Sequence, residues 1–179
     1  MRNFIFVFLI VAAYFGFKEV RKYRTATQPS ATEQSKIVSE SLKAGGAQLS
    51  SAGIPTNCVG KEICITVFVA PWCPACHYSE PTFHAFQKYL PKNRPDIGFG
   101  VVIGASTAEE NEKKKSELAP VESYADNTNQ IMKLRQINAF PTWVITNAEG
   151  KEIHRQGGGI QVTQEAQVAQ ALAAIMGKN

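Results

Sequence analysis

The sequence predicts an α/β domain that begins near Ile54, and three observations support this prediction. Ile63–Ala70 and Ile97–Ile103 are continuous apolar runs rich in β-branched residues, which is typical of strands buried on both faces. Between them, apolar side chains recur at helical spacing over Ala75–Leu90. Strands that alternate with helices in this way favour a central sheet covered by helices.

The later part of the chain predicts the rest of this domain. Thr107–Leu118 is first acidic and then basic, so we expect a solvated helix with opposite charges four residues apart. A short helix, two strands of a hairpin and a last helix follow in chain order: Asn129–Ile137, Thr142–Thr146, Lys151–Gln156 and Gln164–Met176.

Two segments precede the domain. Residues 4–17 are uncharged and apolar, shorter than the ~20 residues that a helix needs to cross a membrane, and fit the apolar region of a signal peptide. We interpret residues 1–24 as an N-terminal signal anchor or signal peptide and favour the uncleaved anchor, because no A-x-A site follows. Residues 25–53 are rich in Ser, Thr, Ala, Gln and Gly and predict a polar linker, which leaves 54–179 as the folded domain.

The net charge of +4 does not indicate a nucleic-acid-binding protein. Residues 1–24 hold five of the 19 basic residues and one of the 15 acidic residues, so the charges of residues 25–179 balance. Binding to a phosphate backbone usually requires a surplus of positive charge. We therefore expect no nucleic-acid partner.

A dithiol motif, Cys73-Pro74-Ala75-Cys76, lies where the first predicted strand ends and the helix begins. A thiol at a helix N-terminus faces unpaired N–H groups and the positive end of the helix dipole, which favours the thiolate. Cys73 has that position and is expected to be the exposed thiol, while Cys76 lies one turn later. Such a pair accepts or donates two electrons by thiol–disulfide exchange.

These residues resemble the thioredoxin superfamily over about residues 54–177. The resemblance rests on PWCPAC at residues 71–76, on Pro81 eight residues after the first cysteine, and on FPT at residues 140–142. It implies a thioredoxin fold, with a central mixed β-sheet flanked by helices. The gap between Cys73 and Pro141 is longer than in minimal thioredoxins, as in membrane-anchored extracytoplasmic relatives, and predicts an insertion before the cis-proline.

The resemblance also implies roles for single residues. Cys73 would attack the substrate and Cys76 would resolve the mixed disulfide. Pro141 would be the cis-proline that positions the partner's backbone, with Phe140 before it and Trp72 shaping the surface around the sulfur. No metal and no organic cofactor is implied.

Four residues near the motif depart from this family or remain open. Val67 stands where thioredoxins carry a buried acid that helps to move the proton of the second thiol, and Glu62 and Glu80 are candidate substitutes. His77 follows the second cysteine; it is either an exposed helix residue or a contributor to the stability of the thiolate.

Cys58 and Cys64 leave several interpretations open. The segment NCVGKEIC at residues 57–64 can form a hairpin that brings both sulfurs together, and we favour a structural disulfide worth about 2 kcal/mol. Two reduced buried cysteines, or a second redox pair that passes electrons to the motif, are the alternatives. A zinc site of all four cysteines fits less well, because Cys64 lies within or at the start of an apolar strand.

A structural disulfide requires an oxidising compartment. We therefore expect a bacterial inner-membrane protein whose domain faces the periplasm, although the basic residues after the apolar run would by the positive-inside rule keep it in the cytoplasm. The expected activity is that of a thiol-disulfide oxidoreductase of the reductase or isomerase type. It would act on protein thiols and disulfides, with the reductase direction favoured and a membrane redox partner. A catalytically inactive scaffold or chaperone of an envelope complex is the alternative, and a copper or zinc carrier is a third.

Overall fold

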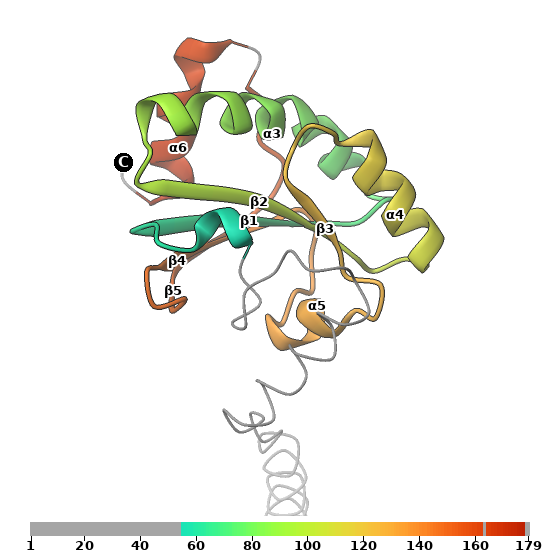
Figure 1. Cartoon of the computed structure of the whole chain (residues 1–179). Coiled ribbons are helices and arrows are strands. Elements are labelled where there is room, and N and C mark those ends of the chain that lie inside the picture. Colours follow the sequence, from blue (N-terminus) through green and yellow to red (C-terminus); the bar gives the residue numbers. More distant parts are fainter. Residues whose placement is uncertain (1–54, 163, 178–179) are drawn as a thin grey trace, which may run out of the picture. The chain divides into compact units, whose positions relative to one another are not determined.

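Five strands form one mixed sheet in the order β3-β2-β1-β4-β5 (Figure 1). β2 pairs in parallel with both β1 and β3, and β4 pairs antiparallel with both β1 and β5. The structure is a computed structural model that describes residues 55–162 and 164–177. The strands are β1 (Ile63–Val69), β2 (Ile97–Ile103), β3 (Ser123–Ala125), β4 (Thr142–Asn147) and β5 (Glu152–Gly157).

Helices cover both faces of this sheet. Figure 1 shows α3 and α6 over one face and α5 against the opposite face, with α4 beside β3. The helices are α3 (Pro74–Asn93), α4 (Ala108–Glu117), α5 (Gln130–Leu134) and α6 (Val168–Ile175), and two short 3-10 turns are η1 (Thr56–Cys58) and η2 (Glu165–Gln167). The expected mixed sheet flanked by helices is confirmed, and α4 with β3 forms the insertion before the hairpin.

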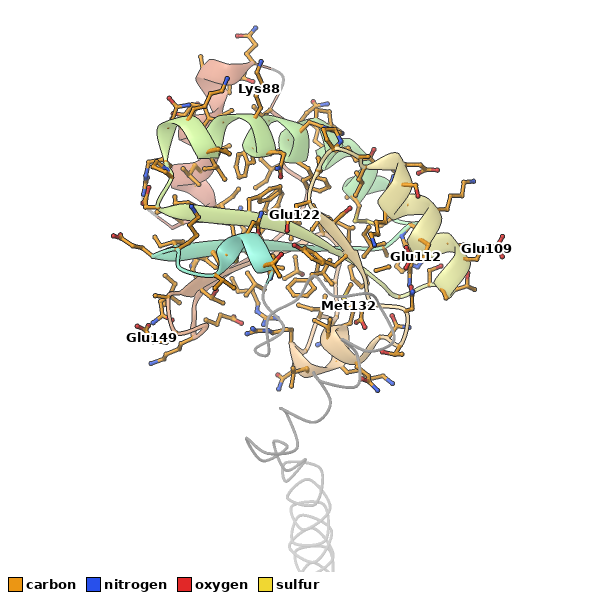
Figure 2. The ribbon with its side chains drawn as sticks, in the orientation of Figure 1. Lys88, Glu109, Glu112, Glu122, Met132 and Glu149 are labelled. Atoms are coloured by element: carbon orange, nitrogen blue, oxygen red, sulfur yellow. A yellow bond between two sulfur atoms is a disulfide. The ribbon has the colours of Figure 1, made fainter. Side chains whose placement is uncertain are left out.

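The central strands are buried on both faces because their side chains alternate between two apolar clusters. Residues 65, 67 and 69 of β1 point towards α3 and α6, where they join Phe83, Phe86 and Trp143 in the larger cluster. Phe68 points the other way and packs with Met132 of α5, which Figure 2 shows against the sheet. Such continuous apolar strands belong at the centre of the sheet, and β1 lies there.

Several element boundaries differ from the expectations. α3 runs three residues past Leu90, through Pro91, which removes one backbone hydrogen bond without ending the helix. β3 was not expected, since three residues carry too little pattern to identify a strand. The short helix spans only Gln130–Leu134, and the last helix is preceded by the 3-10 turn η2.

The interpretation of residues 107–118 as a wholly solvated helix is wrong. Thr107 caps α4 with a reciprocal capping box to Glu110. However, Asn111 and Lys114 on the same helix are buried, because that side of α4 packs against the domain beside Leu118. The ion pairs within α4, Lys114–Glu117 and Lys115–Glu112, are three residues apart rather than the expected four.

The segment before β1 does not form the expected hairpin. Residues 56–58 make the 3-10 turn η1, and a disulfide joins Cys58 to Cys64 across a Cα separation of 5.3 Å. η1 lies so close to β2 that a Cβ atom at Gly98 would stand 2.7 Å from the Cα and Sγ atoms of Cys58. Gly98 therefore makes room for the disulfide against the sheet.

The predicted signal anchor and the polar linker lie outside the described residues. Within the part of the chain that the structure describes, no helix combines the length and the apolar character that crossing a membrane requires.

Candidate active site at the N-terminus of helix α3

Cys73 and Cys76 form a disulfide at the N-terminus of α3, with a Cα separation of 5.2 Å. Cys73 is the N-cap residue, and its Sγ accepts a hydrogen bond from the backbone N–H of Cys76 at 3.1 Å. Pro74 follows in the first turn, where a missing N–H leaves no partner unsatisfied. The sulfur of Cys73 therefore lies where the unpaired N–H groups and the helix dipole stabilise negative charge.

Both sulfurs are buried in this disulfide form. Cys73 is 3% exposed and Cys76 is 1% exposed, so the expectation of a clearly exposed Cys73 is wrong for the oxidised state. The cause is packing, because both cysteines belong to the apolar cluster that also contains Ala70. The two residues differ in position rather than in exposure: one caps the helix and the other lies inside it.

Trp72 and Phe140 form an aromatic pair beside the disulfide. Their ring centroids lie 5.7 Å apart in a T-shaped arrangement, and the indole Nε1 of Trp72 donates to the carbonyl oxygen of Ala105 at 2.8 Å. Trp72 is nevertheless 61% exposed. The peptide bond between Phe140 and Pro141 is cis, as the resemblance implied, and a second cis bond precedes Pro120. Residues that are 68 positions apart in the chain thus meet at one edge of the helix N-terminus.

A cavity of about 500 Å³ opens next to this aromatic pair. Phe140 and Ala105 contribute to its wall, together with polar and apolar side chains of α5 and the segment that follows it. Three lining residues, Ala105, Asn129 and Gln136, have positive φ angles between 53° and 58°, and the Asn129 side chain accepts a hydrogen bond from the Ala105 N–H at 2.5 Å. Non-glycine residues adopt this conformation at a cost, and such residues concentrate at ligand-binding sites.

Arg155 of β5 holds the chain that leads to Phe140. Its guanidinium donates to the carbonyl oxygens of Arg135 and Gln136 at 2.9 and 3.3 Å, and to both carboxylate oxygens of Glu152 at 2.8 and 2.7 Å. Hydrogen bonds from Arg155 lower the pKa of Glu152. Sequence reasoning missed Arg155, because its partners are backbone carbonyls of a segment about 20 residues away.

A polar cluster lies beside the first two turns of α3. The Lys114 ammonium contacts the Glu80 carboxylate at 2.5 Å and the Nδ1 atom of His77 at 3.1 Å, and the other ring nitrogen of His77 lies 2.9 Å from the carbonyl oxygen of Pro71. His77 is exposed, as one interpretation expected, but its ring also connects α3 to α4 and to the loop that precedes Cys73. Sequence reasoning missed Lys114 as a buried residue. The available signal was its position four residues before Leu118, which places both residues on the same helix face.

Cys58 and Cys64 lie far from this site. Cys64 is near the start of β1 and Cys73 follows its end, so the five steps along the strand from Cys64 to Val69 alone span about 16 Å. The four cysteines of the chain are paired in two separate disulfides and do not converge on one position. This arrangement does not fit a single four-thiolate zinc site.

A family model described as a thioredoxin-like domain matches residues 59–174. The chain belongs to this thioredoxin-like family. The matched range contains both cysteines of the motif, the cis-proline and all five strands. No curated protein matches the sequence significantly.

Solved structures share the fold at low sequence identity. A putative thiol:disulfide interchange protein DsbE from Chlorobium tepidum has a TM-score of 0.54 and 20% identity, over 73% of this chain and 93% of that one. A secreted Mycobacterium tuberculosis disulfide oxidoreductase homologous to E. coli DsbE gives 0.50 and 18%, over 75% and 98%. StoA from Bacillus subtilis gives 0.50 and 19%, over 63% and 82%. This thioredoxin-like chain therefore has the fold of these proteins and carries its own close cysteine pair.

Proposed function

We propose that the chain is a thiol-disulfide oxidoreductase that exchanges disulfides with protein substrates through Cys73 and Cys76. The observation that carries this proposal is the disulfide between an N-cap cysteine and a cysteine one turn later in a thioredoxin-like domain. In the reduced protein, the Cys73 thiolate attacks one sulfur of a substrate disulfide and releases the other as a thiol. Cys76 then attacks the Sγ of Cys73, which frees the second substrate thiol and closes the protein disulfide.

The surface around Cys73 would bind the substrate chain. Trp72 presents a large exposed aromatic face whose orientation is fixed by Phe140 and by the Ala105 carbonyl. The cis-proline Pro141 would position the backbone of the substrate, and the cavity beside Phe140 would accept one of its side chains. Because a partner must reach a buried sulfur, we expect binding at these residues to precede exchange.

Reduction of substrate disulfides is the direction we favour. Ala75 occupies the position where strongly oxidising relatives carry a histidine, so it adds no stabilisation to the Cys73 thiolate. A pair that gives electrons must be reduced again, and we propose that a membrane redox partner supplies them. A reduction potential near −270 mV against glutathione supports this direction, whereas a value of about −120 to −180 mV would identify an oxidant or isomerase.

Two variants test the activity itself. In the full-length chain, Cys73→Ser should abolish insulin reduction and trap no substrate, while Cys76→Ser should retain the first attack and accumulate mixed disulfides. A chain without Cys58 and Cys64 is the matched control, because it loses two cysteines of the distant pair. If wild-type protein shows no reversible two-electron titration, the enzyme proposal fails and the scaffold takes its place.

We further propose that the domain faces the periplasm, tethered by residues 1–24 through the linker 25–53. The disulfide between Cys58 and Cys64 supports this location, because such bonds persist in oxidising compartments. One of the similar structures is also described as secreted. Fusion of alkaline phosphatase after residue 179 should give an active enzyme in cells. Activity only of a cytoplasmic reporter at the same position would contradict the proposed orientation.

A further inference from the structure

The side of α4 that packs against the domain carries a lysine. Only 5% of the Lys114 side chain is exposed, although its ammonium is charged and pairs with Glu80 at 2.5 Å and with Glu117 at 3.5 Å. Burying an ammonium costs free energy, and an apolar residue at such a position is often as stabilising as the ion pair. Stability alone therefore does not account for a lysine here.

Asn111 lies one turn earlier on the same side of α4 and is fully buried. Neither its amide nitrogen nor its amide oxygen has a hydrogen-bond partner within the described residues. Unpaired buried polar atoms also cost free energy. Two consecutive turns of α4 thus present polar side chains to the domain where apolar ones would pack, and Lys114 contacts the first turns of α3.

The first two turns of α3 connect this polar face to the disulfide. Glu80 follows Cys76 by four residues, so the two side chains are neighbours on one helix face, with Cβ atoms about 5–6 Å apart. His77 contacts both Glu80 and Lys114 through Nδ1. Its Nε2 lies 2.9 Å from the carbonyl oxygen of Pro71. The cluster therefore touches the loop before Cys73 and flanks Cys76.

We propose that Glu80 and Lys114 are positioning residues whose opposite charges set the reduction potential of the Cys73–Cys76 pair. This inference rests on the proposed function. Reduction by two glutathione molecules breaks the protein disulfide and forms glutathione disulfide. It leaves one protein thiolate, one thiol and one released proton. The new negative charge appears next to the pair, so an unbalanced Lys114 stabilises the reduced form and an unbalanced Glu80 destabilises it.

The two single variants should move the potential in opposite directions. Glu80→Gln leaves the Lys114 charge less compensated, so the equilibrium constant with glutathione should shift about tenfold towards the reduced protein, which is about 30 mV more oxidising. Lys114→Met leaves the Glu80 carboxylate without its partner and should shift the constant about tenfold the other way. The double variant E80Q/K114M should return close to the wild-type potential.

An exposed ion pair on α4 provides the matched control. Glu112 and Lys115 lie 3.7 Å apart with side chains 48% and 32% exposed. Glu112→Gln and Lys115→Met remove one negative and one positive charge, as the test variants do, but solvent screens these charges from the sulfurs. Both variants should keep the wild-type equilibrium constant within about twofold.

The outcomes separate this inference from the proposed function. Suppose that the wild-type protein titrates reversibly, but that E80Q and K114M shift the equilibrium constant with glutathione in the same direction or no further than the controls do. The inference is then overturned, and the enzyme proposal stands. If the wild type does not titrate, the proposed function fails first. If the thermal melt shows that K114M does not fold, E80Q and the double variant still test the inference. A tenfold shift of the equilibrium constant in E80Q that the double variant reverses supports the inference. Any other pattern overturns it.

Discussion

At the scale of single residues, the exposed face of Trp72 is held from two sides. Its indole nitrogen donates to the Ala105 carbonyl, and its ring lies edge-on to Phe140. A rigid aromatic side chain loses little conformational entropy when a partner covers it, which is why such residues anchor interfaces. A protein substrate that binds at Trp72, as we propose, would therefore not have to order this side chain first.

We expect Trp72→Ala and Phe140→Ala to lower kcat/KM for insulin reduction by about tenfold each, because an aromatic pair and its buried area contribute on the order of 1–2 kcal/mol. The rate with a small disulfide such as oxidised glutathione should change little, since it makes few contacts with this surface. Ile153→Ala is the control, because Ile153 is an exposed apolar residue on β5. Equal losses with both substrates would indicate damage to the dithiol rather than to substrate binding.

At the scale of elements, the side chain of Arg155 connects β5 to the segment that leads to the candidate active site. Its guanidinium binds two backbone carbonyls of the segment between α5 and Phe140, and the Glu152 carboxylate fixes its orientation. β5 therefore positions the chain before the cis-proline without contributing a residue to the cavity wall.

This contact predicts a pH-dependent contribution to stability. Hydrogen bonding to Arg155 lowers the pKa of Glu152 below that of the unfolded chain, which is about 4.3. The contact stabilises the folded protein fully when the pH is above the pKa of the unfolded chain. This stabilisation is lost as the pH falls through the lower pKa of the folded protein. The difference in Tm between wild type and Arg155→Met should therefore be larger at pH 6 than at pH 3. It should stay modest, because both side chains are about one-third exposed. An identical difference at both pH values would contradict this assignment.

At the scale of the whole molecule, two disulfides lie near opposite ends of the central strand β1. One joins η1 to the start of the strand, and the other closes the N-terminus of α3 just after its end. The strand between them is rigid, parallel to β2 and antiparallel to β4. The distance along β1 prevents direct exchange between the two pairs, so we assign a structural role to Cys58 and Cys64.

Replacing both Cys58 and Cys64 by alanine should lower the free energy of unfolding by about 2 kcal/mol, because the closed loop is short. The reduction potential of the other pair should not change. Urea unfolding of the oxidised proteins and a glutathione titration measure the two quantities separately. A changed potential together with unchanged stability would instead favour a relay of electrons between the pairs.

The local sequence pattern was sufficient to predict the core strands, the helix α3 and the position of the dithiol. Apolar runs identified β1 and β2, helical spacing identified α3, and Cys73 at a strand-to-helix junction identified the site, because each signal is contained within one element. β3 and the 3-10 turn η1 were missed, since such short segments carry almost no periodicity and are held by neighbours on the sheet.

The sequence by itself determined which residues we propose to carry the chemistry: the spacing of Cys73 and Cys76 and the residues around Pro141 follow from their order in the chain. Only the tertiary structure decided what surrounds them. Lys114 sits in a run of three lysines, and nothing local distinguishes it from its neighbours. It becomes a buried partner of Glu80 because the β2–α4–β3 crossover packs one side of α4 against α3, and burial depends on contacts between segments distant in sequence.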